Sequence, residues 1–254
     1  CSSCGSNNLK MLGFGTEKIE DELEKIFPKK IIKRLDFDTT RSKNAYSNIL
    51  NDFDTRKIDI LIGTQMITKG LDFDNVNLVG ILDADMLLNR PNFRAFEKSF
   101  QLMTQVAGRA GRRKKRGKVI IQTGDPNHWV INKIINHDFI SFFKNEIVER
   151  NNFFYPPFYK IIEINLKNKN ENILQNSSER LASDLREIFK ERVLGPEHPI
   201  IKRIYNYYLK RITLKIERNT NDKKVKDRIL EVIDNFYSDP YNKSTRINID
   251  VDPA

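Results

Sequence analysis

Short apolar runs separated by amphipathic stretches constrain the first half of this chain more than any other feature. The runs Ile58–Ile62 (IDILI), Val76–Leu82 (VNLVGIL) and Lys118–Gln122 (KVIIQ) each have the length of one buried strand. An earlier strand is expected over 30–35, and the segments between strands have helical periodicity. Strands separated by helices predict βαβ units on a parallel sheet. The expected helices are 17–27, 42–53 with Ser42 as N-cap, and 94 to about 105.

The second half of the chain has a different pattern. It begins with a connector, Asn151–Phe158 (NNFFYPPF), whose two prolines cannot continue a helix. The order strand, helix, strand, strand, helix, strand then predicts a ferredoxin-like α+β domain with a mostly antiparallel sheet. A turn is expected at Gly195-Pro196, and the expected elements are 160–166, 172–192, 200–205, 208–216, 222–236 and 245–251. We therefore expect an α/β domain over 13–150 and a smaller α+β domain over 151–254.

Composition narrows the class of protein. The chain has 254 residues, with 44 Lys+Arg against 34 Asp+Glu and a net charge of +10, which favours a polyanionic partner. No apolar stretch has the length of a transmembrane helix, and the start does not resemble a signal peptide. The chain also lacks an initiator Met, as a fragment would. Only two cysteines occur, so we expect a cytoplasmic protein without a disulfide framework.

A polar loop follows the strand Ile58–Ile62. Its sequence is GTQMITKGLDF, and it supplies two glycines, the Thr64 hydroxyl, the Lys69 ammonium and the Asp72 carboxylate. Ligands of parallel α/β sheets bind at the carboxyl ends of strands, so this loop is a candidate phosphate site. A plain turn between strand and helix would explain the loop equally well.

A second motif, QVAGRAGR, ends the helix that is expected from Arg94. Arg109 and Arg112 are separated by small residues, so both guanidinium groups can reach one phosphate group. Arginine in this position can neutralise charge on a transferring γ-phosphoryl group, which is the role of an arginine finger. The alternative is that Arg109 caps the helix C-terminus.

Together these two segments resemble motifs V and VI of superfamily 2 helicases. Longer sequence segments are similar to those of the PriA family of primosomal replication-restart helicases. These segments are DILIGTQMITKG, LDADMLL and NRPNFRAFEKSFQLMTQVAGRAGR. The segments CSSCGS, GFGTEKIEDEL, RLDFDTT, GPEHPIIKRI and DVDP extend the resemblance over the whole chain. The resemblance implies a second RecA-like helicase lobe followed by the C-terminal domain of an ATP-dependent 3′ to 5′ DNA helicase.

The resemblance also implies roles for individual residues. Gly70 and Asp72 would touch the nucleotide, whereas Thr64 and Lys69 would lie near the DNA backbone or couple the two sites. Gln105, Arg109 and Arg112 would face the phosphates of ATP with Mg²⁺, with Arg112 as the finger. The sequence contains no GxxxxGK[ST] loop and no DExx strand end. We therefore expect this chain to be inactive as an ATPase alone.

Cys1 and Cys4 form a C-x-x-C pair, which is the usual spacing for two zinc ligands. No other cysteine occurs, and His128, His137 and His198 lack ligand spacing to the pair, so a redox dithiol or inert cysteines are alternatives. The resemblance implies that both cysteines belong to a zinc-binding insertion. Residues 1–12 would then be its remnant and would hold half of a Zn²⁺ site.

Two basic segments are candidates for nucleic-acid contact. Arg112–Lys118 is nearly all cationic and could track phosphates, or be a solvated hairpin. In the second domain, basic and aromatic residues interleave along two expected strands: Lys202, Arg203, Tyr205, Tyr207, Tyr208, Lys210 and Arg211. Because side chains alternate between the two faces of a strand, we expect about half of these aromatic residues to lie in the core instead. His128 and Trp129 are expected to pack at a helix start. Asp83 and Asp85 are expected to end a strand and could contribute to coupling.

The resemblance implies a monomeric protein. Its expected partners are forked or single-stranded DNA, primosome and helicase-loading proteins, and single-stranded-DNA-binding protein. No membrane partner is expected. Two alternatives remain, namely another superfamily 2 translocase that remodels branched DNA, and a non-enzymatic basic module that binds RNA or ribosomes. The second alternative explains the charge but not the two motifs at their strand and helix ends.

Overall fold

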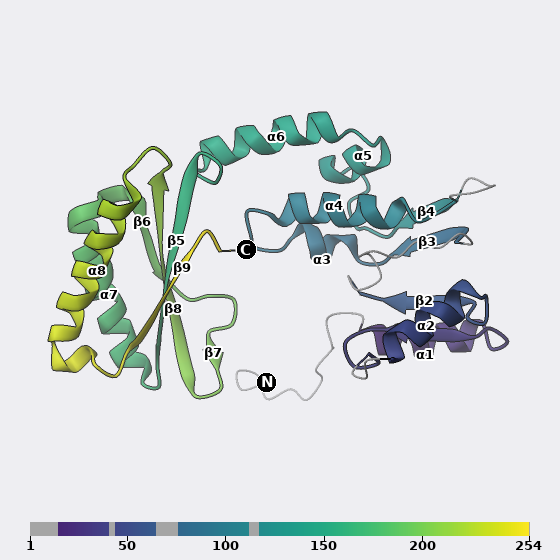
Figure 1. Ribbon diagram of the computed structural model, residues 1–254, viewed down its shortest axis with the longest axis horizontal. Helices are drawn as coiled ribbons and strands as arrows, with labels where there is room; N and C mark the ends of the chain where they lie inside the picture. The colour runs from purple at the N-terminus through teal and green to yellow at the C-terminus, as the bar shows by residue number, and fades with distance from the viewer. Residues whose placement is uncertain (1–14, 41–43, 65–75, 112–116, 254) are drawn as a thin grey trace. The chain divides into compact units, whose positions relative to one another are not determined.

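The computed structural model describes residues 15–40, 44–64, 76–111 and 117–253, and it divides into two compact units (Figure 1). The first unit is Cys1–Phe139 and the second is Ile140–Ala254. Each unit is described by itself. Within the described residues, no helix combines the length and apolarity that a membrane crossing requires.

The first unit has parallel strands with helices between them, as the apolar runs predict. Strand β1 (Ile32–Leu35) pairs in parallel with β2 (Ile60–Gly63), and β3 (Leu78–Ile81) pairs in parallel with β4 (Lys118–Ile121). In the described residues these form two separate two-stranded ladders. A parallel pair needs a crossover, which the intervening helices supply. The helices of this unit are α1 (Thr16–Ile26), α2 (Ala45–Asp54), α3 (Ala84–Leu88), α4 (Ala95–Ala107) and α5 (Trp129–Ile135).

Two local predictions for this unit were wrong. Helix α2 begins at Ala45 with Asn44 as its cap residue, and Ser42, the expected cap, lies outside the described residues. The second concerns Asp83 and Asp85, which were expected to end a strand, whereas Asp83 is the N-cap of the short helix α3 and Asp85 lies within that helix. Its start is fixed by Asp83, which adopts φ 50° and accepts a hydrogen bond from the Met86 N–H. An Asp side chain that caps the next turn explains why the chain leaves the strand here.

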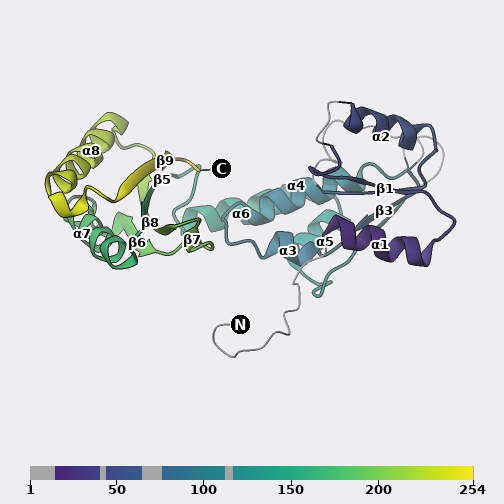
Figure 2. The same ribbon diagram turned by 90° about the horizontal axis from the view of Figure 1, so that it is seen from below.

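The second unit has the ferredoxin-like order predicted from the sequence. After α6 (Phe139–Asn152) the sheet strands run in the order β6-β8-β5-β9, all antiparallel, with the short β7 beside β8. Helices α7 and α8 cover one face of this sheet, as Figure 2 shows. The elements are β5 (Tyr159–Asn168), α7 (Glu171–Phe189), β6 (Val193–Glu197), β7 (Arg203–Ile204), β8 (Tyr207–Glu217), α8 (Asp222–Ser238) and β9 (Arg246–Val251).

The core of this unit lies between the sheet and the two helices. Alternate residues of β5, among them Ile164 and Leu166, face α7 and α8, as period-two patterning requires. Helix α7 contributes Leu174, Leu181 and Leu185, which are at most 1% exposed. Truncation of such a leucine to Ala costs about 2–5 kcal/mol.

The second strand of this domain lies earlier in the sequence than predicted. The apolar run 200–205 was expected to be that strand, but Ile200 is 81% exposed and only 203–204 pair, as β7. The position in the sheet is taken by β6, which includes the Gly195-Pro196 pair expected to be a turn. A Cβ on Gly195 would lie 2.7 Å from the Arg211 carbonyl oxygen, and its φ is 90°. Only glycine allows this strand to pass so close to β8.

Candidate functional site

The carboxyl ends of β1 and β2 lie next to each other in the first unit. Leu35, the last residue of β1, is the register partner of Gly63, the last residue of β2. Asp36 and Thr64 therefore leave the two strands at the same edge. Thr64, which the resemblance places near DNA, is exposed there. This is the edge at which parallel α/β sheets bind ligands.

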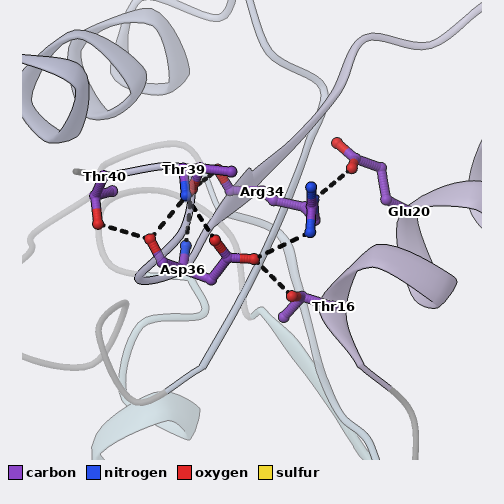
Figure 3. A network of polar contacts seen from close by, with 6 residues as sticks. All are labelled: Thr16, Glu20, Arg34, Asp36, Thr39 and Thr40. Atoms are coloured by element: carbon purple, nitrogen blue, oxygen red, sulfur yellow. Dashed lines mark hydrogen bonds and ion pairs between the residues drawn. The ribbon is translucent and has the colours of Figure 1, made fainter. Parts of the chain in front are cut away.

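A buried carboxylate organises the loop after β1 (Figure 3). Asp36 is 8% exposed, and its Oδ2 accepts a hydrogen bond from the Thr16 hydroxyl at 2.7 Å. Its Oδ1 accepts from the Thr39 N–H at 2.9 Å, and its carbonyl accepts from the Thr40 hydroxyl at 2.6 Å. The Asp36 carboxylate also lies 3.3 Å from Nη1 of Arg34. These partners come from α1, β1 and the loop itself, so the carboxylate ties three segments together.

The same network controls the charge of Asp36. The pKa of Asp36 is lowered, chiefly by the hydrogen bond from the Thr16 hydroxyl, because this bond together with the Thr39 N–H and the Arg34 guanidinium stabilises the ionised carboxylate more than burial disfavours it. Arg34 is in turn paired with Glu20 of α1 at 2.6 Å. The loop that leaves β1 is therefore fixed before any ligand binds. Sequence reasoning missed this site, although an Asp followed three residues later by Thr is a recognisable loop pattern.

The carboxyl ends of β3 and β4 are joined by a second carboxylate. Asp85 at the start of α3 accepts hydrogen bonds from the Thr123 hydroxyl at 2.6 Å and from the Gly124 N–H at 2.7 Å. Both donors follow β4, and they lower the pKa of Asp85. The coupling role suggested for Asp83 and Asp85 stays a prediction. The contacts themselves fix α3 to the loop after β4.

The second motif spans the last turns of α4 and the turn that follows it, Gly108–Gly111, called the GRAG turn below. Gln105 is exposed on the last turns of this helix, and Arg109 is half-buried just after it. The turn is held from behind because the Gly111 N–H donates to the Val76 carbonyl at 3.0 Å, just before β3. Gly117 packs against Ala110 so closely that a Cβ on Gly117 would lie 2.5 Å from the Ala110 Cβ. The small residues of this motif therefore allow two chain segments to touch.

Several residues predicted from the sequence lie outside the described residues. They are Cys1, Cys4, Lys69, Gly70, Asp72 and Arg112. Their roles stay predictions, as do those of Thr64, Gln105 and Arg109. In the described part of the chain, no group of three or more His, Cys, Asp or Glu side chains could hold a metal ion.

His128 and Trp129 pack at a helix start, as expected. The His128 Nδ1 accepts a hydrogen bond from the Val130 N–H at 3.3 Å, which caps α5. Both rings meet the ring of Phe96 in α4 edge-on, with centroids 5.5 Å apart. These aromatics therefore join α4 to α5.

The second unit carries an aromatic ring surrounded by cations. Lys167 and Lys169 lie 5.5 and 5.8 Å from the centroid of the Tyr207 ring, and Arg246 lies 5.4 Å from it. Tyr205, two residues before β8, is 94% exposed. By contrast, Lys210 is 7% exposed and Tyr208 packs against the core, so alternation buries part of the predicted basic and aromatic pattern, as expected. A half-buried Tyr207 ring beside three cations, with the exposed Tyr205 ring two residues earlier, suits stacking of unpaired bases.

Comparison with known proteins shows which protein families the two parts of the chain resemble. Residues 6–114 match the family model of the helicase conserved C-terminal domain, and residues 151–254 match that of the primosomal protein N C-terminal domain. The chain is 38% identical over its full length to replication restart protein PriA of Bacillus subtilis (strain 168), of which it covers 31%. It is 40% identical to the Synechocystis protein of the same name over 82% of its length, covering 25% of that relative. The Haemophilus influenzae relative is 32% identical over the whole chain and 34% covered. The chain thus spans about a third of the length of these relatives.

Proposed function

The chain belongs to the PriA family of replication restart proteins and corresponds to their C-terminal part, and from this premise we propose that it supplies the second RecA-like lobe and the C-terminal domain of an ATP-dependent 3′ to 5′ DNA helicase. The reaction is ATP hydrolysis coupled to movement along one DNA strand. Because the chain spans a third of its relatives, the activity of the whole enzyme is part of the proposal.

One observation carries the proposal most strongly. The GRAG turn at the end of α4 is anchored to the segment before β3 and to Gly117, and both motif positions described there come from a segment that matches the helicase family model. A turn held in this way can present Arg109 and the neighbouring Gln105 to phosphates without further ordering. With ATP and Mg²⁺ bound, these side chains would offer hydrogen bonds and positive charge to the phosphate oxygens.

The nucleic-acid partner is proposed to lie on both units. In the first unit, Thr64 and Lys69 would contact the DNA backbone. In the second unit, the cations around Tyr207 would hold a strand while the ring stacks on a base. We propose a monomer that acts at forked or single-stranded DNA in the cytoplasm, with primosome proteins, helicase loaders and single-stranded-DNA-binding protein as partners.

We propose that this chain carries only two of the four ligands of a zinc site. Cys1 and Cys4 would supply two thiolates, and the remaining two ligands would come from elsewhere in the longer protein. Cobalt titration of the 254-residue chain should then show weak binding without a one-to-one tetrahedral spectrum. A tight tetrahedral complex in the monomer would show that this chain carries a full site.

The function is tested with a chimera. The part of the Bacillus subtilis relative that precedes the matched region is joined to this chain, and ATPase activity is measured with single-stranded DNA. The intact relative is the positive control, and Lys25→Ala, at an exposed position of α1, is the matched charge control. We expect turnover that falls at least 100-fold with Arg109→Ala or Arg112→Ala and is unchanged with Lys25→Ala. A chimera that is active with both arginines replaced would overturn the proposal.

A competition experiment separates this function from the alternatives. Forked DNA, linear duplex and structured RNA compete for binding to the chain at fixed salt concentration. The proposal requires preference for forked DNA. Preference for RNA would favour a non-enzymatic RNA-binding module instead.

A further inference from the structure

A small cavity in the first unit lies outside both helicase motifs. It has a volume of about 70 Å³ and lies between the loop after α3 and the first turns of α4. A water molecule needs roughly 10–15 Å³ of such space, so the cavity holds several waters or one small oxyanion. Its lining residues are Leu87, Arg90, Asn92, Ala95, Lys98, Ser99 and Leu102.

A buried hydroxyl group lies in the wall of this cavity without a partner. Ser99 is 1% exposed, and its Oγ has no hydrogen-bond partner among the described residues. Serine in a helix usually bonds to the carbonyl four residues earlier or points to solvent, and Ser99 does neither. A buried polar atom left without a partner costs about 1–3 kcal/mol, so such an atom indicates a missing ligand.

The charged side chains around the cavity indicate the sign of the charge on that ligand. Arg90 and Lys98 both line the cavity, and neither forms an ion pair within the part of the chain that the structure describes. No acidic residue lines the cavity. The nearest glutamate in sequence, Glu97, instead accepts a hydrogen bond from Gln101 at 3.2 Å. The ligand is therefore an anion.

The backbone of α4 also favours an anion in this cavity. Ala95, the first residue of the 13-residue helix α4, lines the cavity, so the positive end of the helix dipole lies at this site. Asn92 also lines the cavity, and its side chain is held in place because its Oδ1 accepts a hydrogen bond from the Arg94 N–H at 2.8 Å. A guanidinium fork, an ammonium group, a hydroxyl and a helix N-terminus are the donors that bind phosphate in proteins.

We propose that this cavity binds a single phosphate group, held by Arg90, Lys98 and the Ser99 hydroxyl at the N-terminus of α4. Inorganic phosphate and a phosphodiester of a nucleic-acid strand share this chemistry. The site goes beyond the proposed function, because it is separate from both helicase motifs and needs no ATP.

The test is a titration of the 254-residue chain with inorganic phosphate, followed by amide NMR shifts at constant ionic strength set with chloride. Saturable shifts are expected for Ala95 and Ser99, with a dissociation constant near the millimolar range. Arg90→Ala and Ser99→Ala should each weaken binding about tenfold, and Lys98→Glu should abolish it. Lys25→Ala, an exposed lysine elsewhere in the same unit, should leave binding unchanged.

Thermal melting provides an independent readout. Ser99→Ala removes a hydroxyl that has no protein partner, so without phosphate it should melt at the same temperature as the parent chain or higher. Phosphate should raise the melting temperature of the parent chain but not that of Ser99→Ala. Absence of saturable shifts, or phosphate binding that Ser99→Ala and Arg90→Ala leave intact, would overturn the proposal.

A second arm of the experiment identifies the source of the phosphate. A single-stranded oligonucleotide replaces inorganic phosphate, and its affinity is measured over a range of salt concentrations. If a strand is the source, Arg90→Ala lowers its affinity and reduces the salt slope by about one. If only inorganic phosphate responds to the variant, the source is the free ion. Neither result depends on ATPase activity, so failure of the helicase proposal would be seen separately.

Discussion

Gly117 lies so close to Ala110 that a Cβ on Gly117 would come within 2.4 Å of the Ala110 carbonyl carbon and 2.5 Å of the Gly111 nitrogen. Real Cβ atoms do not approach backbone atoms so closely. The start of β4 and the turn after α4 are therefore packed backbone against backbone. This contact fixes the turn at Ala110 and Gly111 against the residue that precedes β4.

Substitution of Gly117 should consequently destabilise the first unit. Gly117→Ala forces two backbone segments apart, and we expect a loss of about 1–3 kcal/mol in the free energy of unfolding, measured by urea denaturation. Gly80→Ala is the matched control, because a Cβ at Gly80 in β3 meets nothing within 4 Å. Equal effects of the two substitutions would contradict the packing described for Gly117.

The Asp36 network makes a second prediction. Asp36→Asn keeps the size of the side chain but removes the charge that Thr16, Thr39 and Arg34 stabilise. We expect it to lower the free energy of unfolding by about 1–3 kcal/mol at pH 7. Asp21→Asn, at an exposed position of α1, should change it by less than about 0.5 kcal/mol.

The pH dependence of this effect has a definite sign. The folded-state pKa of Asp36 is lowered, so its contribution to stability is fully present above the unfolded-state pKa of about 3.9. It is lost as the pH falls through the folded-state value. The difference in unfolding free energy between the parent chain and Asp36→Asn should therefore be constant from pH 7 to about 5 and decrease below about 4. A difference that grows on acidification would show that the carboxylate is not stabilised as described.

Periodicity predicted the type and order of most elements because burial of one face controls both. The strands Ile60–Gly63 and Lys118–Ile121 and the helix Asp222–Ser238 lie within a few residues of the predicted ranges. Periodicity failed where an apolar run is exposed. Ile200 and Ile201 resemble strand residues but are 81% and 61% exposed, and the strand is formed instead by 193–197, where glycine and proline suggested a turn.

The candidate sites were predictable only in part. The resemblance of two sequence motifs to those of helicases made Thr64, Gln105 and Arg109 candidates, and their roles stay predictions. The Asp36 network, the contact between Gly117 and Ala110, and the orphaned Ser99 hydroxyl depend on residues that are far apart in sequence or on burial. Such tertiary contacts leave no periodic pattern, so a single sequence does not reveal them.

The DVDP segment at the end of the second unit supports a third prediction. The Asp252 side chain accepts a hydrogen bond from the Ile161 N–H at 3.0 Å, while the Asp252 N–H donates to the Ile161 carbonyl at 2.7 Å. Asp252 also has φ 51°, which Asn tolerates better than Ala. Asp252→Ala should cost about 1–2 kcal/mol in unfolding free energy and Asp252→Asn clearly less. Asp250→Ala, at an exposed position in β9, is the control for the loss of charge.

Tyr207 supports a prediction about nucleic-acid binding. If its ring stacks on a base above Lys167, Lys169 and Arg246, Tyr207→Ala should weaken binding of a single-stranded oligonucleotide by about 1–3 kcal/mol. Tyr241→Ala is the matched control, because the Tyr241 hydroxyl bonds to Asn176 and the residue lies in the turn after α8. Fluorescence anisotropy at fixed salt measures both variants. Equal losses for the two tyrosines would remove Tyr207 from the binding surface.

The most direct test of the account is an ATPase measurement on the 254-residue chain by itself, with saturating single-stranded DNA. We propose that this chain supplies the residues that would face the ATP phosphates from one side, whereas its sequence has no GxxxxGK[ST] loop to cradle them. We therefore predict no turnover above background for the chain alone and clear turnover once the chain is joined to the upstream part of a relative. DNA-stimulated turnover by the chain alone that disappears with Arg112→Ala would contradict this prediction.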